Sequence, residues 1–196
     1  GQQGFRIRPH QVDSGQPNTI VWSEDQLRGL HGVNRVNLAT SGITVDAQGF
    51  ITWDALPLDF KNASGGAGRF AFDYGFDQVG LPGWNEDGSQ KANEDNSVLE
   101  ILSFVQFPAA GVYTMNVASD DGFRVQTGAS SRDAFAVLLG EYNGGRGVDT
   151  GTSFDLYVEE AGTYPVRVLY ENGAGGAGLE WTTVNSDGTY SLVGDT

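Results

Sequence analysis

The chain has 196 residues, of which 39% are hydrophobic and 11% aromatic, a composition that fits one sizeable domain with a packed core rather than a disordered segment. Its formal net charge of −14 would repel phosphate backbones and anionic lipids and attract cations, so we expect no nucleic-acid partner and no membrane insertion. The lack of cysteine excludes disulfides, thiol chemistry and thiolate zinc sites. No apolar run is long enough to span a bilayer.

Short apolar runs separated by glycine are typical of an antiparallel β-sandwich or barrel, and this chain has 29 glycines between such runs. The stretch 46–49, Asp-Ala-Gln-Gly, predicts a tight hairpin turn. We therefore predict an all-β fold, an antiparallel β-sandwich, over a single domain of residues 1–196. The predicted strands are 5–8, 42–45, 50–53, 68–72, 98–107, 112–118, 123–126, 134–139, 153–158, 164–170, 179–182 and 190–193.

One short helix is predicted near the N-terminus. Ser23 and Gln26 have the spacing of a capping box, Leu27 and Leu30 follow, and Gly32 ends the helix.

Tryptophans on predicted strands, Trp53 and Trp181, are expected in the core. His10 and His31 are expected to be surface or hydrogen-bonded residues, because neither lies near a serine or acid motif that would make a triad.

Two stretches, 80–97 and 141–152, have no strand pattern and predict long loops, where binding residues concentrate. In the first loop, Asp87 with Gly88 and the run 93–96, Asn-Glu-Asp-Asn, are either acidic surface or a second calcium site. In the second loop, Arg146 and Asp149 either flank a site or are solvated.

The adjacent acids Asp120 and Asp121 interrupt an alternating pattern that runs from 113 to 125. Successive side chains of a strand point to opposite faces, so two neighbouring carboxylates serve one site only where the strand ends and the peptide between them is unusual, ideally cis. Two carboxylates aimed at one point in a chain without cysteine suggest calcium. A tight turn is the alternative interpretation of the Asp-Asp-Gly string.

Three segments resemble the PA14 domain family: 113–125 with Ser-Asp-Asp-Gly at its centre, 161–172, and the closing Gly-Leu-Glu-Trp at 178–181. The resemblance covers 98–183, and residues 1–97 are similar to the more variable front half of such domains. It implies a β-sandwich with calcium held by Asp120 and Asp121 across a cis peptide, by Asn172, and by the main-chain carbonyl of Ala174. Sugar hydroxyls would fill the remaining coordination positions of the ion, and Gly173 would also contact the sugar.

The chain departs from the yeast lectins of this family after Asn172. The stretch 173–178 reads Gly-Ala-Gly-Gly-Ala-Gly, where those lectins have bulky side chains, so specificity must come from elsewhere or affinity must be low. Tyr142 and Trp84 are candidates for stacking on a sugar ring, with a place in the core as the alternative for each.

The resemblance implies a calcium-dependent carbohydrate-binding module, a lectin or adhesin domain of a larger extracellular or cell-surface protein. The alternatives are a structural or protein-interaction module that binds no sugar, and an accessory domain of a polysaccharide-degrading enzyme. We expect no catalysis by the chain itself, because carboxylates bound to calcium stay ionised and cannot act as general acids.

Overall fold

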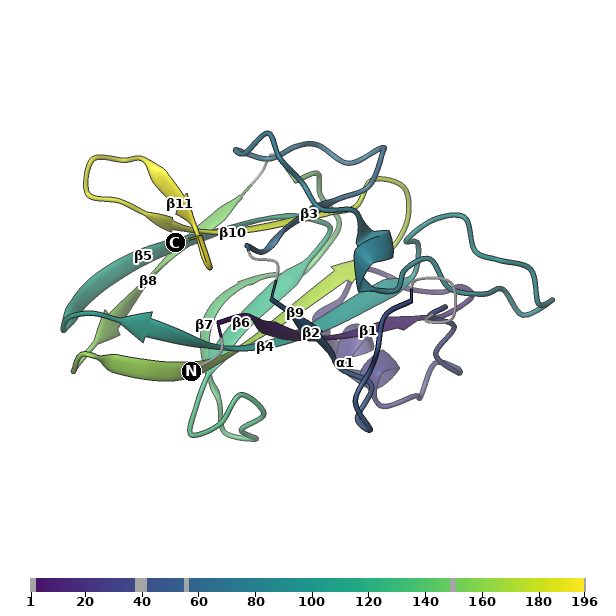
Figure 1. The fold of residues 1–196 in the computed structure, drawn as a ribbon, viewed down its shortest axis with the longest axis horizontal. Helices are drawn as coiled ribbons and strands as arrows, with labels where there is room; N and C mark the ends of the chain where they lie inside the picture. Colours follow the sequence, from purple (N-terminus) through teal and green to yellow (C-terminus); the bar gives the residue numbers. More distant parts are fainter. Residues whose placement is uncertain (1–2, 38–41, 55–56, 149–150, 196) are drawn as a thin grey trace.

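Two antiparallel β-sheets pack face to face in the computed structural model, which describes residues 3–37, 42–54, 57–148 and 151–195 (Figure 1). The six-stranded sheet consists, in spatial order, of β2 (Ile51–Trp53), β1 (Phe5–Gln11), β4 (Ser97–Phe107), β9 (Gly162–Asn172), β6 (Phe123–Thr127) and β7 (Val137–Tyr142). The five-stranded sheet consists of β11 (Tyr190–Leu192), β10 (Gly178–Val184), β5 (Gly111–Asp120) and β8 (Thr152–Val158), with β3 (Asp59–Lys61) paired to β10. The predicted antiparallel sandwich is confirmed.

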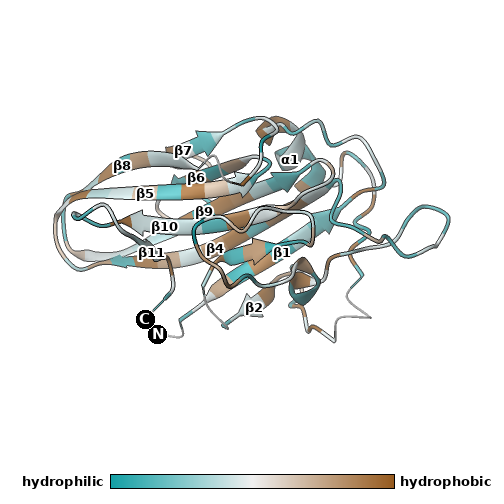
Figure 2. Ribbon diagram, turned by 90° about the horizontal axis from the view of Figure 1, so that it is seen from above, coloured by the Kyte–Doolittle hydropathy of each residue, from teal (hydrophilic) through white to brown (hydrophobic). Residues whose placement is uncertain are grey.

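Apolar residues that alternate with polar ones along the strands form the core between the sheets (Figure 2). As expected, Trp53 and Trp181 lie in this core, 7% and 0% exposed. Tyr170 on β9 is fully buried and stacks on Phe76 of the 3-10 helix η1 (Phe76–Val79) at 5.7 Å between ring centroids. The core therefore reaches the end of β9, where the candidate site lies.

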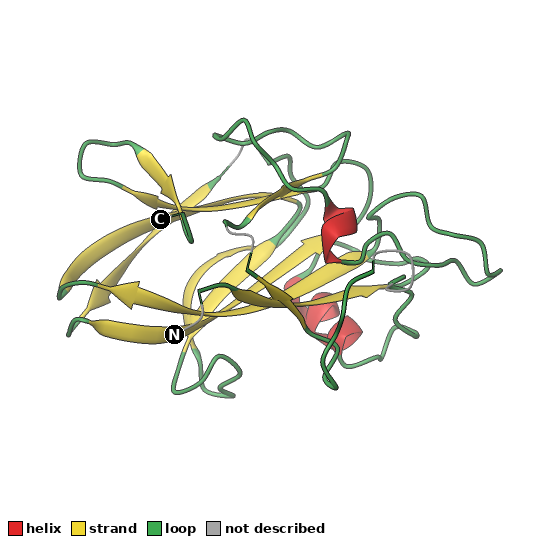
Figure 3. Cartoon of the chain, viewed as in Figure 1, coloured by secondary structure: helices red, strands yellow, loops and turns green. Residues whose placement is uncertain are grey.

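Helix α1 (Ile20–Leu27) covers the outer face of the six-stranded sheet (Figure 3). The helix begins four residues earlier than predicted: Thr19, and not Ser23, is the N-cap, and the Trp22 N–H donates to its Oγ1 at 3.4 Å. Ser23 lies inside the helix and is fully buried. Its hydroxyl donates to the Glu171 carboxylate on β9 at 2.6 Å and does not cap the helix. The predicted helix start is thus wrong, and so is the predicted end at Gly32, because the helix ends at Leu27 with Arg28 as its C-cap.

Most predicted strands are present, with ends shifted by a few residues. Two are wrong. Residues 42–45 are irregular, although the turn at 46–49 forms, with the Asp46 N–H donating to the Phe50 carbonyl at 2.8 Å. Residues 68–72 form a loop, because the N–H groups of Arg69 and Phe70 donate to the Glu180 carboxylate instead of to a neighbouring strand.

The histidines have different environments. His10 is buried on β1, 7% exposed, and burial lowers its pKa to about 4, so it is neutral and does not lie on the surface, the first of its two expected placements. His31 stacks on Trp22 at 3.5 Å between ring centroids. Within the described ranges, no helix has the length and apolar character needed to cross a membrane.

Candidate functional site

Three connections between the two sheets meet at one end of the sandwich: β5 to β6, β7 to β8 and β9 to β10. β5 ends at Asp120, which pairs with Gly178 at the start of β10. The peptide bond between Asp120 and Asp121 is cis, as expected. The Asp121 N–H donates to the Glu171 carbonyl at 3.0 Å, so hydrogen bonding to β9 begins directly after the cis peptide.

The Asp121 carboxylate is 7% exposed and binds two loops. Its Oδ1 accepts a hydrogen bond from the Arg146 N–H at 3.0 Å, and its Oδ2 accepts one from the Gly173 N–H at 2.9 Å. These bonds fix the orientation of the side chain and bring the loop after β7 and the loop after β9 to the same carboxylate.

The Asp120 carboxyl lies beside that of Asp121. Burial and then the negative charge of Asp121 raise the pKa of Asp120 to about 7. The main-chain carbonyl of Asp120 accepts a hydrogen bond from the Tyr170 hydroxyl at 2.6 Å, which anchors the pair to the core. A cation bound between the two carboxyl groups would offset the repulsion that disfavours the ionised form of Asp120.

Asn172, the last residue of β9, lies next to this pair, because the residues on both sides of it bind Asp121. Its side chain is fully buried, and its Nδ2 donates to the Glu94 carbonyl at 3.1 Å. Its Oδ1 is buried without a hydrogen-bond partner in the structure. Burying an amide oxygen without a partner costs free energy, and a cation bound at this oxygen would offset that cost.

Asn18 also lies at the site, although its place in the sequence does not point there. It has a positive φ of 57°, and its Oδ1 is also buried without a partner. The Asn18 side chain lies against Gly173 and close to Gly145, where a Cβ would be 3.0 Å from its Nδ2. The pair Pro17–Asn18 predicts only a turn, and nothing local in the sequence connects this turn to the loop after β9.

The glycine-rich loop after Asn172 approaches the site closely because it lacks side chains. A Cβ at Gly173 would collide with the Asn18 amide, and a Cβ at Gly176 would lie 2.5 Å from Asp120 Oδ2. Ala174, whose carbonyl was expected to contact the ion, is exposed in this loop. The glycines therefore leave space around the two aspartates.

Tyr142 and Arg146 hold the loop after β7 in place. The Arg146 guanidinium lies over the Tyr142 ring at 4.2 Å, and its Nε donates to the Ser119 carbonyl at 3.0 Å. The Tyr142 hydroxyl donates to the Gly145 carbonyl at 3.2 Å. One face of the ring that was expected to stack on a sugar is thus covered by Arg146. Asp149 lies outside the described residues.

Trp84 lies in the loop between η1 and β4, part of which extends away from the sandwich at the right of Figure 1. It is 38% exposed, its N–H donates to the Arg35 carbonyl at 2.6 Å, and no described contact connects it to the aspartate pair. Asp87 closes a turn by accepting from the Ser89 N–H at 2.9 Å. The run 93–96 packs against the site instead, through Glu94 and Asn172.

The oxygen atoms around Asp120 and Asp121 fit calcium, a hard ion that binds about 6–8 oxygens, including amide and main-chain carbonyl oxygens. Two carboxylates, two unpartnered amide oxygens and a loop free of bulky side chains are present. In the described part of the chain, no three His, Cys, Asp or Glu residues are grouped so that they could hold a metal. The candidate site would therefore depend on amide and main-chain oxygens as well as on its two carboxylates.

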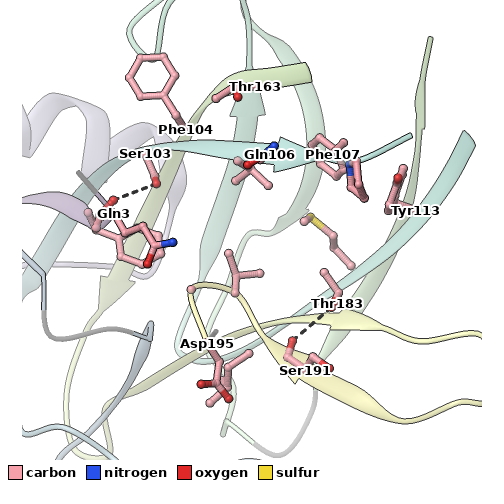
Figure 4. A pocket seen from close by; sticks show the side chains of 18 of the residues that line it. Gln3, Ser103, Phe104, Gln106, Phe107, Tyr113, Thr163, Thr183, Ser191 and Asp195 are labelled. Atoms are coloured by element: carbon pink, nitrogen blue, oxygen red, sulfur yellow. Dashed lines mark hydrogen bonds between the residues drawn. The ribbon is translucent and has the colours of Figure 1, made fainter. Parts of the chain in front are cut away.

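A cavity of about 1410 Å³ lies away from the candidate site, between the sheets near the turn that joins β4 to β5 (Figure 4). Phe107, Tyr113 and Thr183 are among its lining residues. The hydrogen bonds drawn there run from Ser103 to the Gly4 carbonyl and from Thr183 to the Ser191 carbonyl. Asp120, Asp121 and Asn172 do not line it. Residues of β1, β4, β5, β10 and β11 line this cavity, which is separate from the candidate site.

The fold is that of PA14 domains. One similar solved structure is a PA14 sugar-binding domain from an RTX adhesin, with 17% identity, a TM-score of 0.58, and coverage of 98% of this chain and 95% of that one. Another is the A domain of epithelial adhesin 9 from Candida glabrata in complex with Galb1-4GlcNAc, with 9% identity, a TM-score of 0.56, and coverage of 95% and 84%. A third is the PA14 domain of the antifreeze protein MpAFP, with 13% identity, a TM-score of 0.55, and coverage of 96% and 86%. No family model matches the sequence, and no curated protein does.

Proposed function

We propose that this chain is a calcium-dependent carbohydrate-binding module of a larger extracellular protein of the adhesin kind. The observation that carries the proposal is the unpartnered, fully buried side-chain oxygen of Asn172 beside the carboxylates of Asp120 and Asp121. These three side chains would hold the ion, with main-chain oxygens of the glycine-rich loop, such as the Ala174 carbonyl, as further ligands. Asn18 lies close enough to the same loop to add its amide oxygen.

When bound, calcium supplies coordination positions that two vicinal hydroxyls of a sugar fill in place of water. The residues of the chain orient the ligands: the N–H groups of Arg146 and Gly173 hold the Asp121 carboxylate, and Tyr170 holds the main chain at Asp120. Binding of this kind breaks no bond, so the proposal assigns no catalytic residue.

Two observations outside the site support the proposal. The similar structures include a domain described as sugar-binding and an adhesin domain solved with Galb1-4GlcNAc. The net charge of −14 favours cations over anions near the surface.

A glycan array probed in calcium and again in chelator, with the wild type and Asp121→Asn, tests the proposal. We expect glycan binding that requires calcium and that the variant loses. Binding that persists in chelator would contradict the role of calcium. A wild-type protein that takes up calcium but binds no glycan would instead support the alternative, a structural or protein-interaction module.

A further inference from the structure

A groove of about 450 Å³ adjoins the aspartate pair along the glycine-rich loop. Gly175 lines the groove, and the next residue, Gly176, lies between Asp120 and the opposite wall: a Cβ there would be 2.5 Å from Asp120 Oδ2 and 3.3 Å from the Ser64 carbonyl oxygen. The volume is within the range of about 300–1,000 Å³ that is common for small-molecule sites. Asp120, Asp121 and Asn172 do not themselves line the groove, so a ligand bound at Asp120 would reach it by extending past Gly176.

Fixed polar side chains form the walls of this groove. Asn62 Nδ2 donates to Glu94 Oε2 at 2.9 Å and to the Gly175 carbonyl at 3.0 Å. Asp95 Oδ1 accepts from the Gly175 N–H at 2.9 Å. Carboxylate and amide oxygens held in this way are acceptors for hydroxyl groups, and the glycine-rich loop contributes a wall without the bulky side chains that would fill the space.

The charge of the groove is negative. Asp77, Glu94 and Asp95 line it, and Lys61 is the one cationic residue among the described residues that do so. The Lys61 ammonium also interacts with Asp73, where it opposes the rise in pKa that burial causes. An anionic group in the groove would meet more negative than positive charge, whereas a neutral hydroxyl would meet hydrogen-bond acceptors.

We propose that this groove receives the second sugar unit of a bound glycan, that its specificity-determining residues are Asn62, Asp77, Glu94 and Asp95, and that it selects neutral units against units with a carboxylate or sulfate. The groove has this role only if the neighbouring aspartate pair binds the first unit, so the inference rests on the proposed function.

Matched disaccharides test this selectivity by NMR titration with the free calcium concentration held constant. The probes are the methyl glycosides of lactose, cellobiose and mannobiose, each beside the same compound oxidised to a carboxylate at C6 of one ring. We expect at least one neutral compound to bind roughly tenfold more tightly than its carboxylate counterpart, an effect of the size that one repelled charge produces in a partly solvated groove. High salt should reduce the difference, because it screens the repulsion.

The double variant Asp77→Asn/Glu94→Gln removes two of the groove charges and keeps the shape of both side chains, with one acceptor oxygen of each replaced by an N–H₂ donor. With both proteins saturated with calcium, we expect it to narrow the difference to about threefold or less. Glu159→Gln/Glu160→Gln is the matched control: it makes the same charge change in the exposed turn before β9, and the whole 11-residue strand separates that turn from Asn172.

Equal binding of neutral and carboxylate sugars by the wild type would overturn the selectivity and leave the proposed function intact. A difference that the double variant does not change would overturn the role of the groove residues. If none of the three neutral sugars binds in calcium, the inference fails together with the sugar-binding part of the proposed function.

Discussion

At the scale of single residues, the candidate site depends on side chains that are absent as well as on those present. Gly176 has no Cβ where one would lie 2.5 Å from Asp120 Oδ2, and its backbone φ is not in the left-handed region, so alanine could adopt the same conformation. The role of this glycine is therefore close approach and not an unusual backbone angle.

Gly176→Ala should weaken calcium binding about tenfold or more, because the methyl group would displace the Asp120 carboxylate or the loop, and one repositioned ligand costs on the order of 10–100-fold in affinity. Isothermal titration calorimetry gives the affinity, and circular dichroism checks the fold. Gly147→Ala is the matched control, since a Cβ there meets nothing within 4 Å. Equal calcium affinity of the two variants would show that the space beside Asp120 is not used.

The site residues differ in how far the sequence could predict them. Asp120 and Asp121 are conspicuous because they interrupt an alternating strand pattern, and the resemblance adds Asn172. Asn18 could not be found in this way: it lies more than 150 residues before Gly173 in the chain, and only the folded structure brings the two together. The role of Arg146 as a support over Tyr142 also depends on tertiary contacts.

At the scale of secondary-structure elements, helix α1 is attached to the site through one buried hydrogen bond. Ser23 Oγ donates to Glu171 Oε2 at 2.6 Å, and the other carboxylate oxygen, Oε1, is buried without a partner. Burial raises the pKa of Glu171 to about 7, and the bond from Ser23 opposes this rise. The helix thereby binds the buried side chain of Glu171, the residue whose main-chain carbonyl accepts a hydrogen bond from the Asp121 N–H.

Ser23→Ala should lower the free energy of unfolding by about 1–3 kcal/mol, because it leaves a buried carboxyl without a hydrogen-bond partner. Urea unfolding of the calcium-free protein measures the change. Val21→Ala on the same helix is the control: Val21 is 69% exposed, so its truncation should change stability by less than about 0.5 kcal/mol. A Ser23 variant as stable as the control would contradict this role of the bond.

Strands β3 and β10 place two buried acids opposite each other, Asp59 and Glu180. Burial, then the charges of Asp73 and Glu180, raise the pKa of Asp59 to about 8, above its ordinary value of 3.8. Between these two pH values the folded chain holds a proton that the unfolded chain has lost. Stability therefore falls as pH rises through this window.

Asp59→Asn should remove this part of the pH dependence, because an amide is uncharged and its N–H₂ donates where the protonated carboxyl does. Between about pH 6 and pH 9, we expect the wild type to lose about 1–3 kcal/mol more stability than the variant. Urea unfolding at a series of pH values measures the difference. Parallel stability curves for the two proteins would contradict the shifted pKa.

The elements that the sequence predicts well are long strands with alternating side chains, such as β4, β5 and β9. The short β3 was missed because its three residues, Asp59–Lys61, contain one apolar side chain. Residues 68–72 alternate like a strand, yet Phe72 is 67% exposed and the nearby main chain binds the Glu180 carboxylate. The helix start was misplaced because Ser23 makes a tertiary hydrogen bond instead of a cap.

At the scale of the whole molecule, the two ends of the sandwich differ. The end where β5 and β9 finish carries the aspartate pair, the glycine-rich loop and the polar groove. The other end carries the cavity lined by Phe107 and Tyr113. The sequence could predict the sandwich from strand spacing, but it could not predict that residues 18, 62 and 94 surround the same corner, because these contacts join distant parts of the chain.

The central claim is that Asp120, Asp121 and Asn172 hold one calcium ion. Calorimetric titration of calcium into chelator-treated protein tests it, with Asp121→Asn beside the wild type. Asp187→Asn is the control, because Asp187 closes a turn by accepting from the Thr189 N–H and asparagine suits the same turn. We predict one calcium per chain in the wild type and the control, and no measurable binding in Asp121→Asn. A wild type that binds no calcium, or an Asp121 variant that binds it equally well, would contradict the claim.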